Sequence, residues 1–250
     1  MKGIILAGGK GTRLYPLTAS VSKQLLPVYD KPMVYYPLAT LKEGGIKDVC
    51  LISSPDHIDL FKALLGDGEQ YRMSIEYRTQ TKPAGIAEAL IIAEDFIGKD
   101  SVALILGDNL IHGSVDVRIA FETFKSGATI FGYRVSNPSD YGVIGFGPTG
   151  LVESIEEKPE KPKSQYAVPG LYLYDSDVVE RAKRLTPSKR GELEITDLNR
   201  SYLEDGLLNV VLMEPGAAWL DCGTPESLLE AANYVRTIQY RQGIMVGSPL

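Results

Sequence analysis

The chain has few of the residues that build disulfide frameworks and metal clusters. Its 250 residues include two cysteines, Cys50 and Cys222, and two histidines, His57 and His112. Two cysteines exclude both a disulfide framework and a four-cysteine zinc site, and two histidines leave little room for histidine-rich metal chemistry. We expect Cys222 to be a small packing residue and not a reactive thiol.

Positive charge and long apolar runs are also scarce. Lys and Arg together number 26 against 32 Asp and Glu, so the formal charge is −6. Proteins that bind nucleic acid or anionic membranes depend on clustered Lys and Arg, so we expect neither partner. No apolar run is long enough for a membrane span, and the first residues lack the apolar core of a signal peptide. A cytoplasmic protein is therefore expected.

The first half of the chain alternates short aliphatic and β-branched runs with helical patterns. The predicted strands are 2–7, 49–53, 74–78 and 102–106, and the predicted helices are 33–43, 58–65 and 86–96. Repeated strand-helix-strand units indicate an α/β fold with a Rossmann-like, mostly parallel central sheet flanked by helices. In such a sheet, ligands collect at the loops that follow the carboxyl ends of the strands.

The pattern changes after about residue 128. Strands are predicted at 128–135, 142–146, 151–157 and 167–174, separated by turns, and they indicate an additional antiparallel β section. Helices at 177–185, 195–204 and 225–241 and a strand at 209–213 follow. We expect one domain over residues 1–250, with portions at about 1–127 and 128–224 and a C-terminal helix and tail at 225–250. The last residues, 243–250, are expected to be loosely held.

A glycine-rich loop directly follows the first predicted strand. In Gly8-Gly9-Lys10-Gly11-Thr12-Arg13, the glycines let backbone N–H groups approach a phosphate closely. Arg13 adds a planar guanidinium, and Lys23 lies further along the loop, so the two cations favour a polyphosphate. The alternative is a tight turn that merely needs glycines. The spacing fits neither Walker A nor the dinucleotide fingerprint, which weakens the hypothesis of a P-loop kinase.

Two aspartates are candidate ligands of Mg²⁺. Asp108 comes just after the predicted strand at 102–106, and Asp221 precedes the helix predicted from Pro225. Mg²⁺ prefers one or two carboxylates together with phosphate oxygens of the substrate. Asp221 could alternatively cap the helix, but Thr224 is the better placed capping residue.

Two further loops carry groups suited to a sugar phosphate and to a pyrimidine. Lys158 could bind a second phosphate and Glu157 could accept hydrogen bonds from sugar hydroxyls, although such a charged run is usually a solvated edge. Gln80 offers both a donor and an acceptor, which suits a pyrimidine edge, and Gly85 lets the backbone face a flat ring.

Together these motifs resemble the sugar-phosphate nucleotidylyltransferases. The opening Gly8-Gly9-Lys10-Gly11-Thr12-Arg13-Leu14-Tyr15-Pro16-Leu17-Thr18, with Lys23 and Pro27, looks like the signature of that family. Supporting stretches, in the order of the family, are 107–109, 156–159, 166–168 and the especially specific 190–197. The resemblance covers almost the whole chain, as a short form of the family.

The resemblance implies a Mg²⁺-dependent transfer from dTTP to α-D-glucose 1-phosphate, giving dTDP-glucose and diphosphate by in-line attack on the α-phosphorus. It places the chain in dTDP-sugar biosynthesis, such as the dTDP-rhamnose pathway, and implies a homo-oligomer, either a dimer or a tetramer. UTP in place of dTTP is the closest alternative. A non-catalytic relative that senses sugar nucleotides is another, although such a protein should have lost some charged site residues.

The resemblance also assigns residues by position. Catalytic roles fall on Arg13, Lys23, Asp108, Lys158 and Asp221, with Mg²⁺ on Asp108 and Asp221. The nucleotide-binding residues are Leu6, Gly8, Gly9, Gly11, Thr12, Arg13, Lys23, Gln24, Gln80, Pro83, Gly85 and Asp108. The sugar-phosphate-binding residues are Asn109, Gly142, Glu157, Lys158, Val168, Tyr172, Arg190 and Trp219. The chain departs from the family at Lys10, at Pro169 and in its shorter C-terminal region.

Overall fold

The computed structural model describes residues 1–250, which divide into two compact units. The first unit consists of residues 2–83, 105–113 and 216–250, and the second of residue 1 and residues 84–104 and 114–215. The predicted class, a mixed α/β fold with a mostly parallel sheet flanked by helices and an antiparallel section, is confirmed. None of the helices combines the length and the apolar composition that crossing a membrane requires.

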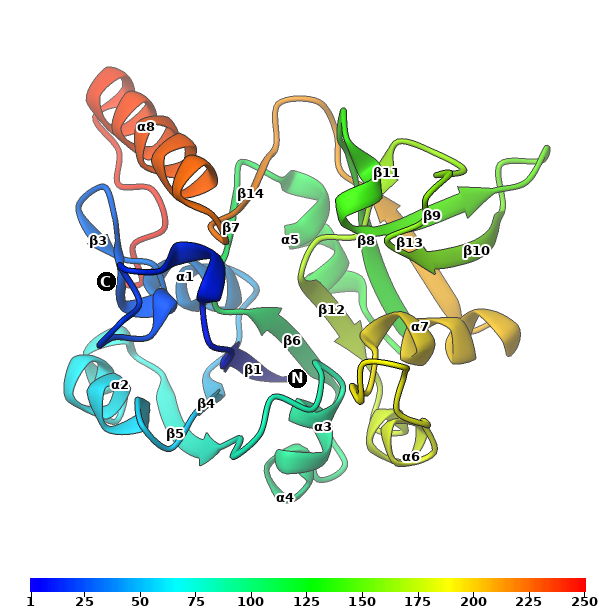
Figure 1. Ribbon diagram of the computed structural model, residues 1–250, viewed down its shortest axis with the longest axis horizontal. Helices are drawn as coiled ribbons and strands as arrows, with labels where there is room; N and C mark the ends of the chain where they lie inside the picture. The colour runs from blue at the N-terminus through cyan, green and yellow to red at the C-terminus, as the bar shows by residue number, and fades with distance from the viewer. The chain divides into compact units, whose positions relative to one another are not determined.

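The first unit is built on parallel strands. Strand β1 (Lys2–Ala7) pairs with β4 (Asp48–Ser53), and β4 pairs with β5 (Ser74–Thr79), as Figure 1 shows. Helices α1 (Tyr35–Glu43) and α2 (Ile58–Leu65) connect these strands. The aliphatic residues of β1 and β4 are buried without alternation, as expected for a parallel sheet covered on both faces.

The remaining elements of the first unit are short, apart from the last helix. They are η1 (Thr12–Leu14), η2 (Lys23–Leu25), β2 (Pro27–Val28), β3 (Lys31–Pro32), η3 (Glu69–Tyr71), β7 (Asn109–His112), β14 (Ala218–Asp221) and α8 (Pro225–Gln242). Helix α8 begins where the sequence predicts. Its N-cap Thr224 and Ser227 form a capping box with Pro225 in the first turn, and it ends at Gly243 with φ 67°.

The second unit holds the antiparallel section. Its strands are β8 (Ala128–Arg134), β9 (Gly142–Phe146), β10 (Val152–Glu157), β11 (Tyr166–Ala167), β12 (Leu171–Tyr174) and β13 (Leu208–Leu212). All neighbouring pairs are antiparallel except β13, which runs parallel to β8. Its helices are α3 (Glu88–Ile92), α4 (Glu94–Ile97), α5 (Val115–Thr123), α6 (Val178–Lys183) and α7 (Ile195–Glu204), with η4 (Pro138–Asp140). Strand β6 (Val102–Leu106) runs from the second unit into the first.

Two predicted elements differ from the structure, and some observed elements were not predicted. The helix predicted at 86–96 is two helices, because the backbone of Ala93 leaves the helical region at ψ 14°. The strand predicted at 167–174 is interrupted at Pro169, whose nitrogen has no hydrogen to donate to a ladder. Strand β7 and helix α5 were not predicted.

The C-terminal tail packs on the first unit at Val246 and Pro249, which the expectation of a loose tail at 243–250 did not include. Val246 is buried in an apolar cluster of the first unit, and its carbonyl accepts a hydrogen bond from Lys31. Lys42 of α1 donates to the carbonyl of Pro249, which is also buried. The cluster is formed by Val28, Met33, Tyr36, Leu110, Cys222, Ala231, Val235 and Val246.

Candidate active site

The glycine-rich loop follows β1 in the first unit. Gly9 and Gly11 have φ of 92° and 59°, which favour glycine. A methyl group on Gly11 would also lie 2.9 Å from Cγ2 of Thr18, whose hydroxyl donates to the carbonyl of Gly11 over 2.8 Å. The glycine at position 11 is thus required both by backbone conformation and by space. Arg13 lies in η1 and is exposed.

Gln24 fixes the start of this loop. Its side chain is 1% exposed and donates from Nε2 to the carbonyl of Gly8 over 3.2 Å, while its Oε1 accepts from the hydroxyl of Ser22. Gln80 also lies close to Gly8, since a methyl group there would be 2.9 Å from Oε1 of Gln80. The structure therefore brings the loop, Gln24 and Gln80 together. Supporting roles for Thr18 and Ser22 were not predicted, although Thr18 belongs to the family-like opening signature.

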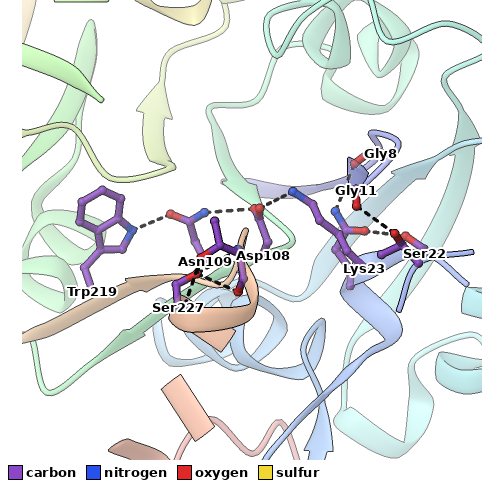
Figure 2. A network of polar contacts seen from close by, with 11 residues as sticks. Gly8, Gly11, Ser22, Lys23, Asp108, Asn109, Trp219 and Ser227 are labelled. Carbon is purple, nitrogen blue, oxygen red and sulfur yellow. Dashed lines mark hydrogen bonds and ion pairs between the residues drawn. The ribbon is translucent and has the colours of Figure 1, made fainter. Parts of the chain in front are cut away.

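Asp108 stands between β6 and β7 and is 9% exposed. The ammonium group of Lys23 forms an ion pair with its Oδ2, and Nδ2 of Asn109 donates to its Oδ1 over 3.2 Å (Figure 2). Burial raises the pKa of Asp108, but the charge of Lys23 and these hydrogen bonds outweigh it and leave the pKa below its ordinary value. Asp108 is therefore a buried, ionised carboxylate.

Asp221 lies near Asp108, although the two residues are far apart in the sequence. Strands β7 and β14 form an antiparallel ladder in which Asp221 lies directly opposite Asn109, and the N–H of Cys222 donates to the carbonyl of Asp108 over 2.9 Å. Directly opposed residues project from the same face of a ladder with Cβ atoms about 4.5–5.5 Å apart. The ladder thus places Asp221 opposite the residue that follows Asp108, so the two predicted metal ligands lie near each other.

The surroundings of Cys222 and Gly223 also indicate that Asp108, Asp221 and Arg13 lie near one another. Burial, followed by the negative charges of Asp108 and Asp221, raises the pKa of the Cys222 thiol to about 12, so this cysteine is a neutral packing residue. A methyl group on Gly223 would lie 2.7 Å from Nη2 of Arg13 and 3.8 Å from Oδ2 of Asp221. Arg13 of the glycine loop therefore reaches the turn that follows β14, next to Asp221.

This donor set fits Mg²⁺. No group of three or more His, Cys, Asp or Glu side chains that could hold a metal occurs in the chain. Two carboxylates near phosphate-binding cations are, however, the set that Mg²⁺ uses when the substrate supplies further oxygens. Asp108 and Asp221 are thus the residues that would hold the ion.

In the second unit, the structure brings together part of the predicted sugar-phosphate set. Thr196 of α7 donates to Oε2 of Glu157 over 2.7 Å, and the N–H of Val168 donates to the carbonyl of Gly142 over 2.8 Å. A methyl group on Gly142 would be 3.5 Å from both the Glu157 carboxylate and the Thr196 hydroxyl. Thr196 was not among the predicted site residues, although it lies in the family-like stretch 190–197.

Three other predicted residues of the second unit have distinct surroundings. Lys158 is exposed and has φ 44°, which is rare for a residue with a side chain, so the turn after β10 holds it in an unusual backbone conformation. Arg190 forms a two-oxygen ion pair with Glu194. Tyr172 is buried and stacks on Tyr174, with ring centroids 6.1 Å apart.

Gly85 lies against the segment that precedes α7. Its φ is 111°, and a methyl group there would be 2.3 Å from the carbonyl oxygen of Leu193. The N–H of Leu193 donates to the carbonyl of Ala84, and the N–H of Ala87 donates to the carbonyl of Leu193. Gly85 is therefore the residue that allows these two backbone segments of the second unit to meet.

Comparison with known proteins shows the family to which the chain belongs. The family described as nucleotidyl transferase matches residues 2–238. The chain belongs to the nucleotidyl transferase family, and it is an enzyme of that class.

More particular similarities are to glucose-1-phosphate thymidylyltransferases. The protein of that name from Neisseria meningitidis is 55% identical over 98% of this chain and 86% of its own length, and the one from Mycobacterium tuberculosis is 55% identical over 100% and 87%. A provisionally named member from Bacillus anthracis, solved with sucrose, is 45% identical with a TM-score of 0.88 and covers 94% of this chain and 95% of its own. A UDP-glucose pyrophosphorylase solved with UDP-glucose shares the fold alone, at 23% identity, with a TM-score of 0.82 and coverage of 94% and 98%.

Proposed function

We propose that the enzyme is a Mg²⁺-dependent glucose-1-phosphate thymidylyltransferase, which converts dTTP and α-D-glucose 1-phosphate to dTDP-glucose and diphosphate. The observation that carries this proposal is the convergence of Asp108, Asp221, Lys23 and Arg13 beside a glycine-rich loop in the first unit. The relatives at 55% identity that bear this name support the choice of substrates.

The proposed reaction needs charge stabilisation more than proton transfer. A phosphate with a second pKa of about 6 is largely dianionic at neutral pH, so the sugar phosphate attacks the α-phosphorus without a general base. The bond that forms joins a phosphate oxygen of the sugar phosphate to the α-phosphorus, and the bond that breaks releases diphosphate. Since both reactants are anions, their mutual repulsion is the main obstacle.

The residues of the first unit would meet this obstacle. Arg13 and Lys23 offset the charge of the triphosphate and of the departing diphosphate, while the N–H groups of the glycine loop cradle the phosphates. Asp108 and Asp221 would hold Mg²⁺, which when bound supplies charge neutralisation at the phosphates. Gln80 and Pro83 would bind the pyrimidine, and the family resemblance also assigns Gly85 of the second unit to the nucleotide.

Residues of the second unit would bind the sugar phosphate. Lys158 would offset the incoming phosphate, and Glu157 would accept hydrogen bonds from sugar hydroxyls in an orientation fixed by Thr196. Gly142, Val168, Tyr172 and Arg190 complete the part of the proposed set that lies in this unit, and Asn109 and Trp219 of the first unit are its other members. No carbon–oxygen bond of the sugar breaks, so the anomeric configuration is retained.

Diphosphate release from dTTP and glucose 1-phosphate tests the function. We expect turnover with Mg²⁺, its loss with a chelator, and a preference for dTTP over UTP of about 10- to 200-fold, since one methyl group separates the two bases. A preference for UTP would favour the uridylyltransferase, and the absence of turnover with either nucleotide would favour a sensor of sugar nucleotides.

Two variants test the assigned residues. Arg13→Ala and Asp108→Asn should each lower turnover by about 100-fold or more, because each removes charge from the proposed phosphate or metal site. Asp59→Asn is the matched control, since Asp59 is an exposed carboxylate on α2 that pairs with Lys62. A folded Asp108→Asn enzyme with near-normal turnover would contradict the metal site. The family resemblance also leads us to expect a homo-oligomer, whose mass light scattering would measure. We expect the protein to be located in the cytoplasm.

A further inference from the structure

A chain of hydrogen bonds leads from Trp219 to Asp108. The indole Nε1–H of Trp219 donates to Oδ1 of Asn109 over 2.6 Å, and Nδ2 of the same amide donates to Oδ1 of Asp108 over 3.2 Å. Figure 2 shows the three side chains in a row that ends at Lys23. All three are buried, with exposures of 8% for Trp219, 3% for Asn109 and 9% for Asp108.

The chemistry of the three groups fixes the direction of this chain. An indole N–H can only donate, and an ionised carboxylate can only accept. An asparagine amide offers an oxygen at one end and an NH₂ group at the other, and a half-turn about χ2 exchanges them. With the indole at one end, the amide of Asn109 must present its oxygen there, so its NH₂ group faces Asp108.

We propose that Trp219 and Asn109 are positioning residues for Asp108: the indole selects the amide orientation in which Asn109 holds the carboxylate. The inference rests on the proposed function of Asp108 as a ligand of the metal–nucleotide complex, and it gives Trp219 and Asn109 a role besides contact with the sugar phosphate. Hydrogen bonds to a ligating carboxylate set its orientation, and loss of such partners typically weakens metal affinity about 10- to 100-fold.

The β7–β14 ladder explains why this pair can act as a rigid support. Trp219 lies opposite Ile111, and Asp221 lies opposite Asn109, so the alternation of the strands places all four side chains on one face. Leu110 and Leu220 project from the other face, where they pack in the apolar cluster of the first unit. The backbone that carries Trp219 and Asn109 is thus fixed by the core.

The test measures the affinity for Mn²⁺–dTTP by calorimetry, without sugar phosphate. Trp219→Phe keeps the aromatic ring and removes the donor, and we expect about 3- to 10-fold weaker binding. Asn109→Ala should weaken binding about 10- to 100-fold. The double variant should bind no more weakly than Asn109→Ala alone, because Trp219 acts through Asn109. Trp219→Phe carries the test alone if Asn109→Ala fails to fold.

Tyr36→Phe is the matched control. It also removes one buried aromatic donor of the first unit, since the hydroxyl of Tyr36 donates to the carbonyl of Val28 over 2.7 Å, but it leaves the Asp108 chain intact. This variant should lose stability and keep its affinity for Mn²⁺–dTTP. Unchanged affinity in Trp219→Phe, or a change confined to the KM for glucose 1-phosphate, would overturn the proposal.

A second readout separates this inference from the proposed function. Because the chain has one tryptophan, its indole proton gives a single resonance in an NMR spectrum. That proton should exchange slowly with solvent in the wild type and at least 10-fold faster in Asn109→Ala. Equal exchange rates would refute the hydrogen-bond chain even in an active enzyme. Slow exchange in a protein that neither binds Mn²⁺–dTTP nor releases diphosphate would instead refute the proposed function, and with it the positioning role.

Discussion

Replacing Lys31 by Met should remove much of the attachment of the C-terminal tail to the rest of the first unit. The Lys31 side chain is 7% exposed, and its ammonium group pairs with Asp30 and donates to Oε1 of Gln239 over 3.2 Å and to the carbonyl of Val246 over 3.1 Å. It also lies 5.2 Å from the centre of the Tyr36 ring. One buried cation thus ties β3, α8 and the tail together.

The magnitude follows from these partners. Removing one member of a buried ion pair costs about 3–5 kcal/mol, but the Asp30 side chain is 32% exposed and can recover some hydration. Met keeps most of the apolar stem of Lys31, so the packing loss is small. We therefore expect Lys31→Met to lower the free energy of unfolding by about 2 kcal/mol, which corresponds to a fall in Tm of about 4–8 °C.

Urea unfolding at pH 7 measures this loss, with Lys62→Met as the control. Lys62 and its partner Asp59 are both exposed, at 52% and 85%, so the control should lose about 0.5 kcal/mol or less. Burial raises the pKa of Asp30, whereas Gln239 and Lys31 lower it below its ordinary value. The contribution of the pair is therefore present above about pH 4 and lost as the pH falls through the folded-state pKa. Equal losses in both variants would refute the reasoning.

Two further predictions concern Gly85 and His112. Gly85→Ala should lower the free energy of unfolding by about 2 kcal/mol or more, because its methyl group would meet the Leu193 backbone. The control is Gly150→Ala, which is also at positive φ but has open space around it and should lower the free energy of unfolding by about 1 kcal/mol; equal losses would contradict the steric argument. His112, which hydrogen-bonds to Tyr234, has its pKa lowered by burial. Its contribution to stability is thus present above about pH 6.5 and lost below it. Urea titrations should show that the wild type loses more free energy of unfolding than His112→Gln between pH 7 and pH 5. Equal losses in the two proteins would contradict this prediction.

The sequence predicts the elements whose signal is local. Strand β1 and helices α2 and α7 have the predicted bounds, because aliphatic runs and helical periodicity reflect neighbouring residues. The position of Asp108 just after the predicted strand at 102–106 is likewise a local signal, and it predicts that this residue can bind a ligand. Strand β7 escaped prediction because it is four residues long and is a strand only through its pairing with β14, more than 100 residues later.

The same distinction separates the predicted parts of the site from the unpredicted ones. A glycine loop or an aspartate after a strand is visible in a sequence, since the residue type carries the chemistry. The bonds of Trp219 to Asn109 and of Thr196 to Glu157 join residues 110 and 39 positions apart, and no local pattern specifies them. Contacts that would orient the proposed site residues are therefore harder to predict than those residues themselves.

The two faces of the β7–β14 ladder connect stability with the proposed chemistry. Leu110 and Leu220 on one face pack with Cys222 and the buried side of α8, and Asn109 and Asp221 occupy the other. Because a one-residue slip in a ladder moves every side chain to the opposite face, any register that buried the aspartate would also expose the leucines. The apolar cluster therefore fixes the register that places Asp221 beside Asp108, and the proposed metal site is specified by the core beneath it.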